Sequence, residues 1–364
     1  MFKGFYSGKR VLVTGHTGFK GSWLCQWLSQ LGAHVAGFSI GVPSQPSNFE
    51  VLKLGARVKD FRGDVRNLDE LVRVFEEFQP DMAFHLAAQP LVRASYDEPK
   101  LTFDTNLGGT VNFLEAVHRT PSVKVGVVIT SDKCYENVEW DYGYRETDRL
   151  GGKDPYSASK ACAEIAFSAY WRSYCAAGDK RLATVRAGNV IGGGDWARER
   201  VVPDCIRAWA NGEAPLIRNP GAPRPWQHVL EPLSGYLWLG VGLISGHSGL
   251  AGEAFNFGPR AEVNQPVSKL VEEMLKTWPA GSWNRQTQSG TEKPEAGLLK
   301  LCCDKALRRL DWQAILSFEE TVRMTAEWYQ RYHAGENDMA AFTTTQIRLY
   351  ETLAKGRSVR WAAS

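Results

Sequence analysis

A tyrosine and a lysine four residues apart are the first side chains whose spacing suits chemistry. In the run Tyr156-Ser157-Ala158-Ser159-Lys160 the outer two side chains would lie on one face of a helix. A lysine ammonium beside a phenol lowers the pKa of the phenol, so that tyrosinate can take a proton from a substrate hydroxyl while hydride leaves the same carbon. The pair predicts the oxidation of an alcohol; an ordinary helix-surface pair is the alternative.

Three polar residues follow a predicted strand upstream of this helix. They are Ser131, Asp132 and Lys133. Ser131 is placed to hydrogen-bond the same substrate hydroxyl as Tyr156. Asp132 and Lys133 are adjacent, and on an irregular loop both side chains can reach one substrate, whereas a solvated Asp-Lys turn is the alternative. We predict that these three residues join Tyr156 and Lys160 in one catalytic group.

A glycine-rich turn directly follows the first predicted strand and opens a helix. Its spacing is GxxGxxG, with Gly15 for a tight turn, Gly18 for close approach of a pyrophosphate and Gly21 for helix-to-sheet packing. Free N–H groups at the helix start favour an anion there. This placement predicts a dinucleotide site. The predicted cofactor contacts in this turn are Gly15, Thr17, Gly18, Phe19 and Gly21.

Further cofactor contacts are predicted at later strand ends. Asp64 closes a strand-like stretch and is placed to accept from an adenine amino group, while small residues after His85 let a dinucleotide lie close. His85 itself is expected to be a hydrogen-bonded core residue. The predicted contacts in this part of the chain are Asp64, Val65, Leu86, Ala87, Ala88 and Asn106, together with Tyr156 and Lys160.

One expected cofactor residue is missing. An acidic side chain about 20 residues after the glycine turn usually binds the adenosine ribose hydroxyls. Ser39 stands at that place, and no arginine adjoins it in the sequence to bind a 2′-phosphate. The prediction is therefore NAD rather than NADP, with low affinity.

The elements that must position these residues alternate between strand-like and helix-like segments in the first half of the chain. This pattern is typical of a parallel sheet covered on both faces. The predicted strands are residues 11–14, 34–38, 82–86, 125–130 and 181–186, with a later strand at 254–257. The predicted helices are residues 18–31, 68–78, the one opened by Asp154-Pro155, 233–244, 267–277, 304–310 and a last one at 318–333.

The fold class that follows is α/β: a Rossmann-type doubly wound parallel sheet with a smaller, mixed α/β C-terminal substrate-binding lobe. Residues 1–187, with a returning segment at 226–258, are expected to bind NAD. Residues 188–225, rich in Gly, Pro, Arg and Trp, and residues 259–350 are expected to form the substrate lobe. Residues 351–364 are expected to be a loosely ordered basic tail.

Composition excludes several classes of protein. The chain has 364 residues, 43% hydrophobic and 23% charged, and its net charge of +3 is too small to argue for nucleic acid or an anionic membrane. Seven cysteines without metal-site spacing indicate neither a disulfide framework nor a metal site, and they suit a reducing cytosol. The apolar stretch 233–244 is too short for a membrane span and is expected to be a buried helix.

These motifs together resemble the extended short-chain dehydrogenases that act on nucleotide sugars. The resemblance covers nearly the whole chain and includes Arg186-Ala187-Gly188-Asn189 and Arg224-Pro225-Trp226-Gln227-His228-Val229. In that family the dTDP-glucose and GDP-mannose 4,6-dehydratases have Asp-Glu after the serine or threonine. The run from Ser131 to Asn137 is instead similar to that of the CDP-glucose 4,6-dehydratases. Inverting UDP-N-acetylglucosamine dehydratases also have Asp-Lys, so the dipeptide alone does not choose the substrate.

The resemblance implies an internal redox cycle on CDP-glucose, in deoxysugar biosynthesis for surface polysaccharide. Tyr156, Lys160 and Ser131 would oxidise C4, Lys133 would handle the C5 proton and Asp132 would protonate the departing C6 hydroxyl. Arginine suits phosphate oxygens. A homodimer or homotetramer is the arrangement that the family implies. The implied substrate contacts are Gln89, Arg93, Asn189 and Arg224.

Other interpretations stay open. A 4-epimerase needs no acid–base pair beyond Tyr, Lys and Ser, and a non-catalytic dinucleotide-binding protein would keep the fold without turnover. Base recognition is expected in the Trp196-to-Arg218 loop, where the tryptophans either stack on a base or serve packing. A solvated surface role is expected for a set of further arginines, namely Arg186, Arg198, Arg200 and Arg218.

Overall fold

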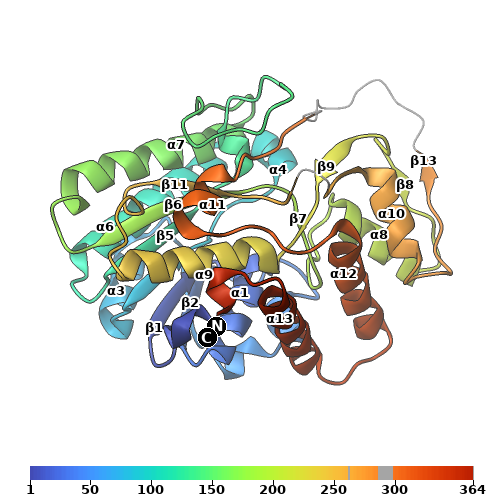
Figure 1. Ribbon diagram of the computed structural model, residues 1–364, viewed down its shortest axis with the longest axis horizontal. Helices are drawn as coiled ribbons and strands as arrows, with labels where there is room; N and C mark the ends of the chain where they lie inside the picture. Colours follow the sequence, from blue (N-terminus) through green and yellow to red (C-terminus); the bar gives the residue numbers. More distant parts are fainter. Residues whose placement is uncertain (261–262, 286–297, 364) are drawn as a thin grey trace.

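A parallel sheet of seven strands forms the centre of the computed structural model, which describes residues 1–260, 263–285 and 298–363 (Figure 1). The strand order is β11-β6-β5-β4-β1-β2-β3, so the chain builds outward from β1 first to one side and then to the other. This order confirms the doubly wound Rossmann-type sheet. The strands are β1 (Arg10–Thr14), β2 (His34–Ser39), β3 (Lys59–Arg62), β4 (Met82–His85), β5 (Val125–Ile129), β6 (Arg181–Ala187) and β11 (Ala254–Phe257).

Both faces of the sheet are covered because successive strand residues point to opposite sides. On β1, Val11 and Val13 pack into one hydrophobic core, whereas Leu12 packs into another. Three helices cover the Leu12 face: α3 (Leu68–Phe78), α6 (Gly109–Arg119) and α7 (Pro155–Tyr170). Three others cover the opposite face: α1 (Phe19–Gln30), α9 (Leu230–Ile244) and α13 (Met339–Gly356).

The helices begin where their sequences place capping residues. The Asn67 side chain accepts from the backbone N–H groups of Asp69 and Glu70 at the start of α3. Asp154 caps α7 by accepting from the Ser157 N–H, with a proline in the first turn. The predicted buried helix is α9, whose residues are buried on every side up to Leu243. Short helices in the 92–119 region, missed by the sequence analysis, are α4 (Val92–Asp97) and α5 (Pro99–Phe103).

A smaller group of elements lies beside the sheet (Figure 1). Its helices are α8 (Val201–Ala210), α10 (Val267–Leu275) and α12 (Phe318–His333). Its strands pair as β7 (Val190–Ile191) with β10 (Gln227–His228), β8 (Leu216–Ile217) with β13 (Asn284–Arg285), and β9 (Pro223–Pro225) with β12 (Asn264–Pro266). Parallel and antiparallel pairs both occur, which confirms a mixed α/β lobe. Residues 261–262 and 286–297 of the predicted lobe lie outside the described residues.

The C-terminal segment differs from its prediction. The helix at 318–333 is not the last one, because α13 follows it with an Asp338 cap. The expectation of a loosely ordered tail at 351–364 is also wrong: α13 extends to Gly356, and Trp361 is fully buried. The Trp361 ring stacks on Phe2 and on Tyr350, so the chain ends lie together (Figure 1). A threonine run in the first half of α13 hides its helical apolar spacing.

Three simple properties bear on function. No helix within the described ranges is long and apolar enough to cross a membrane. In the same part of the chain, no cluster of three or more His, Cys, Asp and Glu side chains is arranged to hold a metal ion. All seven cysteines are free thiols.

The short helix α11 (Asp304–Leu310) packs on β11 at the outer edge of the sheet.

Candidate active site

The predicted catalytic residues come together at the carboxyl edge of the sheet, where α/β proteins bind their ligands. The ammonium of Lys160 on α7 donates to the carbonyl of Ile129, the last residue of β5, over 3.4 Å. Tyr156, one turn earlier on α7, hydrogen-bonds Ser131. The predicted trio of Tyr156, Lys160 and Ser131 is therefore assembled by α7 packing across the end of β5.

Burial shifts the pKa values of Tyr156 and Lys160. Desolvation raises the pKa of Tyr156 to about 12, while its hydrogen bond to Ser131 and the charge of Arg200 lower it. Desolvation lowers the pKa of Lys160 to about 8, against the opposing charge of Glu164. The charged forms of both groups are therefore penalised in this dry pocket, and groups that favour the tyrosinate become important.

Asp132 and Lys133 lie in a short 3₁₀ turn, η4 (Asp132–Cys134). The Ser131 hydroxyl accepts from the Lys133 N–H over 3.2 Å and donates to the Asp132 carboxylate over 3.0 Å. Asp132 is buried, and desolvation raises its pKa although the Lys133 ammonium acts against the shift. A raised pKa favours the protonated carboxyl, which is the form that a general acid requires. A Cβ on Gly188 would lie 2.9 Å from an Asp132 oxygen, so the chain at Gly188 borders the acid.

The glycine turn fits a dinucleotide. Gly15 has a φ of +73°, and a Cβ there would lie 2.6 Å from the backbone nitrogen of Ala87. A Cβ on Gly21 would lie 2.1 Å from the Gly15 carbonyl oxygen. At Gly18, by contrast, a Cβ would meet only the Gly15 oxygen, at 3.3 Å. The turn therefore leaves an open cradle at the start of α1 for a pyrophosphate.

The remaining predicted cofactor residues surround this turn. The backbone nitrogens of Leu86 and Ala87 bind Thr14, which holds the end of β4 against the end of β1. Thr17 donates to the Gly41 carbonyl over 2.6 Å. Phe19 opens α1, and Ala88 is half-buried just after β4.

Asp64 and Val65 follow β3. The Asp64 carboxylate accepts from the side chain of Arg66, and this ion pair lowers its pKa, so Asp64 stays ionised. Val65 is buried against Gly109 of α6. Asn106 is buried, and its amide binds the backbone of Gln89 and the hydroxyl of Ser159, tying the segment after β4 to α7.

A chain of three side chains occupies the place of the missing acid. The Ser39 hydroxyl lies 2.9 Å from His16 Nδ1, and His16 Nε2 lies 2.9 Å from an Asp60 oxygen. An acid thus reaches the end of β2 from β3 through a buried histidine. Arg62 pairs with Ser39 in the strand register, which the sequence could not show, but its guanidinium is bound to Asp60.

The predicted substrate residues are spread around the same edge. The Gln89 side chain accepts from the Leu91 N–H over 2.6 Å and donates to Thr102 over 2.8 Å. Arg93 forms a half-exposed ion pair with Glu199 at 3.1 Å. Asn189 directly follows Gly188, the residue that borders Asp132. Arg224 is half-buried on β9, and its guanidinium donates to the Pro223 carbonyl. These last two lie on the lobe side of the site.

Two cations near the catalytic group were missed by the sequence analysis. Lys20 is half-buried, and desolvation followed by the charge of Arg200 lowers its pKa to about 8, while Asp132 opposes the shift. A lysine in the first turn of a helix opposes the helix dipole, which was the available signal. Arg200 forms an ion pair with Asp195 at 2.7 Å, and its charge lowers the pKa of Tyr156. The surface role predicted for Arg200 is therefore incomplete, and no sequence pattern indicated its location.

Burial decides between the roles predicted for Arg186, the three tryptophans and His85. The solvated role predicted for Arg186 is wrong, because its side chain is 4% exposed and forms an ion pair with Glu164 at 2.8 Å. Trp196, Trp209 and Trp226 are all buried, which favours packing over base stacking. His85 is a buried core residue, with Nδ1 2.8 Å from the Thr14 hydroxyl, as predicted.

Comparisons with known proteins agree with this geometry. Residues 12–325 match the family described as GDP-mannose 4,6 dehydratase. A CDP-glucose 4,6-dehydratase of Salmonella typhimurium is 45% identical over 96% of this chain and 98% of its own length. A dTDP-glucose 4,6-dehydratase of Haemophilus influenzae is 26% identical over 88% and 97%. The solved UDP-glucose 4-epimerase of Thermus thermophilus in complex with NAD is 27% identical, with a TM-score of 0.73 over 88% of this chain and 99% of that one.

Proposed function

Because this chain belongs to the GDP-mannose 4,6 dehydratase family, we propose that it is a NAD-dependent lyase that converts CDP-D-glucose to CDP-4-dehydro-6-deoxy-D-glucose. The observation that carries the proposal is the joining of two chemical sets at one place. Tyr156 and Lys160 suit the oxidation of an alcohol, and the adjacent Asp132 and Lys133 suit the elimination of water. The 45% identity to a CDP-glucose 4,6-dehydratase supports the choice of substrate.

The reaction divides among these residues. Tyr156 takes the proton of the C4 hydroxyl, with Ser131 holding that hydroxyl and Lys160 supporting the tyrosinate. NAD, when bound, accepts hydride from C4 and returns it at C6. The 4-keto group acidifies C5, where Lys133, as a neutral amine, takes the proton. The same lysine gives a proton back to C5 when hydride reaches C6. Asp132 gives its proton to the C6 hydroxyl, which leaves as water, so the sugar is dehydrated without net oxidation.

Cofactor and substrate take different sides of the site. The glycine cradle, the segment after β4, Asp64 and Val65 hold NAD, and the group Asp60, His16 and Ser39 lies where the adenosine ribose is expected. The lobe of residues 188–225 and 259–350 holds the nucleotide sugar, with Arg224 and Asn189 on the diphosphate. Gln89 and Arg93 are proposed second contacts on the other side.

The wider setting follows from the same assignment. We infer a cytoplasmic homodimer or homotetramer that supplies a deoxysugar for surface polysaccharide. Neither nucleic acid nor a membrane is proposed as a partner, since the net charge is only +3.

A 4-epimerase is the second candidate, because a UDP-glucose 4-epimerase shares the fold at 27% identity. One experiment separates the two. The protein with NAD⁺ is incubated in D₂O with CDP-glucose, dTDP-glucose, GDP-mannose or UDP-N-acetylglucosamine, and NMR identifies the products. We expect a 4-keto-6-deoxy sugar with deuterium at C5 from CDP-glucose alone. Turnover of a different nucleotide sugar would keep the reaction type but change the assigned substrate. An epimer without any 6-deoxy product would overturn the proposal.

A further inference from the structure

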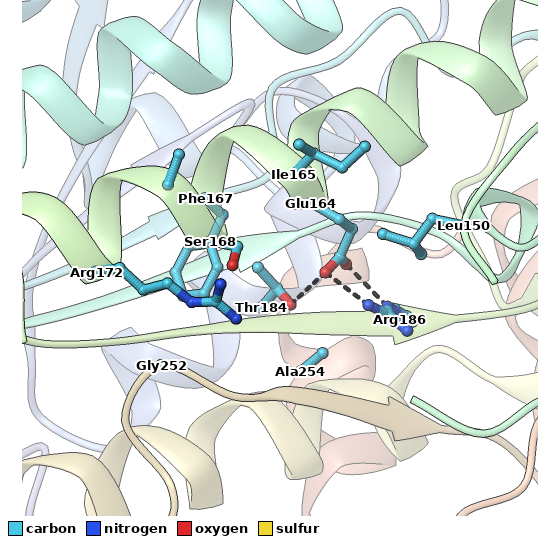
Figure 2. A pocket seen from close by; sticks show the side chains of 11 residues that line it. Leu150, Glu164, Ile165, Phe167, Ser168, Arg172, Thr184, Arg186, Gly252 and Ala254 are labelled. Atoms are coloured by element: carbon cyan, nitrogen blue, oxygen red, sulfur yellow. Dashed lines mark hydrogen bonds and ion pairs between the residues drawn. The ribbon is translucent and has the colours of Figure 1, made fainter. Parts of the chain in front are cut away.

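A buried carboxylate ties together the segments that carry the catalytic residues (Figure 2). Glu164 lies on α7 one turn after Lys160, and its side chain is 3% exposed. One carboxylate oxygen accepts from the Thr130 hydroxyl at 2.5 Å, and the other accepts from the Thr184 hydroxyl at 2.7 Å. The guanidinium of Arg186 on β6 donates to both oxygens, over 3.0 and 2.8 Å. A single side chain thus joins α7 to β6 and to the residue just before Ser131.

The same guanidinium continues to the other end of the catalytic segment. Arg186 donates to the Tyr135 hydroxyl over 2.7 Å and lies 4.8 Å from the centre of the Tyr135 ring. The Tyr135 hydroxyl in turn donates to the Asn256 side-chain oxygen over 2.8 Å. Tyr135 is 1% exposed, and its ring also stacks on Tyr144. These contacts leave the donor and the acceptor capacity of the Tyr135 hydroxyl both in use.

We propose that Glu164, Arg186 and Tyr135 form a positioning network, which fixes Ser131, Asp132 and Lys133 relative to the catalytic helix. Thr130 and Tyr135 stand immediately outside the segment 131–134, and both are held by this network. The inference deepens the proposed function and rests on it for its kinetic readout.

The network acts through the catalytic residues and not on the substrate. Glu164, Thr184 and Arg186 line a hollow between α7, β6 and β11, whose described lining contains none of the five predicted catalytic residues (Figure 2). Burying a charged pair is expensive unless every partner is satisfied, and apolar residues often stabilise such a site equally well. A fully bonded pair next to the catalytic segment is therefore better explained by the geometry that it imposes than by stability.

The test uses two tyrosine variants matched in burial. Tyr135→Phe keeps the ring and removes the hydroxyl that receives Arg186. Tyr6→Phe is the control, since Tyr6 is also 1% exposed and loses its buried hydrogen bonds, to the Leu237 carbonyl and to the Met82 sulfur. In Tyr135→Phe we expect kcat for CDP-glucose to fall about 10-fold to 100-fold with KM unchanged, because small displacements of catalytic groups have effects of that size. Amide hydrogen exchange of residues 131–135 should become faster. The control should change neither.

A second variant covers the charged part of the network. Arg186→Lys keeps the charge but loses the forked geometry, so it should raise exchange in residues 131–135 and lower kcat in the same way. Equal exchange and equal kcat in Tyr135→Phe and Tyr6→Phe would overturn the inference. If the unaltered protein fails to turn over CDP-glucose, the proposed function falls, whereas the exchange comparison still decides whether the network positions the segment.

Discussion

In the proposed reaction Tyr156 must lose a proton, although burial raises the pKa of its phenol to about 12. Ser131 and the charge of Arg200 both lower the pKa of the phenol and so favour its ionised form. Lys160 beside it has a pKa lowered to about 8 by desolvation, so its ammonium persists below that pH. Ser131 and Arg200 thus act against the effect of burial on the phenol, whereas the charges of Asp132 and Asp154 add to it.

The first prediction concerns this phenol. Tyr156→Phe removes the only atom proposed to take the C4 hydroxyl proton, so kcat with CDP-glucose should fall by about 10² to 10⁴. Binding of CDP-glucose, measured by calorimetry, should change little, because the ring remains. Tyr170→Phe is the matched control on the same helix, where the lost hydroxyl donates to Glu115. A Tyr156→Phe enzyme with full kcat would contradict the role.

The second prediction separates elimination from oxidation. Lys133→Met removes the proposed base at C5, so incorporation of solvent deuterium at C5 and formation of the 6-deoxy product should both fall at least about 100-fold. NMR of the products in D₂O measures both. Lys153→Met, at an exposed lysine just before α7, should behave like the unaltered protein. Undiminished C5 exchange in Lys133→Met would assign the base to another group.

The sequence predicted the residues whose spacing indicates a role and missed those whose place in the site depends on tertiary packing. That Tyr156, Lys160 and Ser131 lie together was predictable, because helical spacing and a strand end fix where they point. Lys20 and Arg200 were not, since their positions depend on how α1 and the loop before α8 pack around Asp132. The solvated role predicted for Arg186 was wrong, because the sequence gives no sign that this strand residue pairs with the buried Glu164 of α7.

At the scale of elements, one buried carboxylate on α9 links this helix to two C-terminal segments. Glu231 is buried and accepts from the backbone N–H groups of Ile315 and Leu316, over 2.8 and 2.6 Å. Its second oxygen lies 2.8 Å from the Tyr350 hydroxyl of α13. Desolvation raises the pKa of Glu231 to about 7, although these hydrogen bonds oppose the shift.

The third prediction follows from the sign of this shift. The folded pKa of Glu231 lies above the ordinary value of 4.5. The protonated carboxyl therefore contributes its full stabilisation of the folded state below pH 4.5, and this contribution is lost as the pH rises to about 7. Glu231→Gln cannot titrate. Its unfolding free energy, relative to the unaltered protein, should therefore rise by about 2 to 3 kcal/mol between about pH 5 and about pH 8. Urea unfolding at several pH values measures this difference, and a difference that stays constant with pH would contradict the raised pKa of Glu231.

Elements with strong periodicity or clear caps were predictable, and those without were not. The start of α3 at Leu68 and that of α7 at Pro155 followed from Asn67 and Asp154. Helix α13 was missed because residues 343–345 are three threonines, which interrupt the apolar pattern. The two-residue strands of the lobe carry too few residues for any alternation, so their pairing depends on tertiary contacts.

At the scale of the whole molecule, the two chain ends close one core. The ring of Trp361 lies 5.2 Å from that of Phe2 and 5.5 Å from that of Tyr350, and Trp27 of α1 meets it edge-on at 6.1 Å. The N-terminal turn, α1 and α13 thus share one aromatic cluster on the face of the sheet opposite α7 (Figure 1).

The fourth prediction tests this closure. Trp361→Ala removes a fully buried indole, so the unfolding free energy should fall by about 3 to 5 kcal/mol. Trp140→Ala, at a side chain 41% exposed, should lose less than about 1 kcal/mol. Thermal or urea unfolding followed by fluorescence compares the two. Equal stability of the two variants would show that the C-terminal segment is not part of the folded core.

The most direct test of the central claim follows one atom through the reaction. CDP-glucose carrying deuterium at C4 is incubated with the protein and NAD⁺ in ordinary water, and the product is analysed by NMR and mass spectrometry. A closed cycle on one sugar predicts that the deuterium appears at C6 of the 4-keto-6-deoxy product. Deuterium lost to solvent, or retained at C4 of an epimer, would contradict the account.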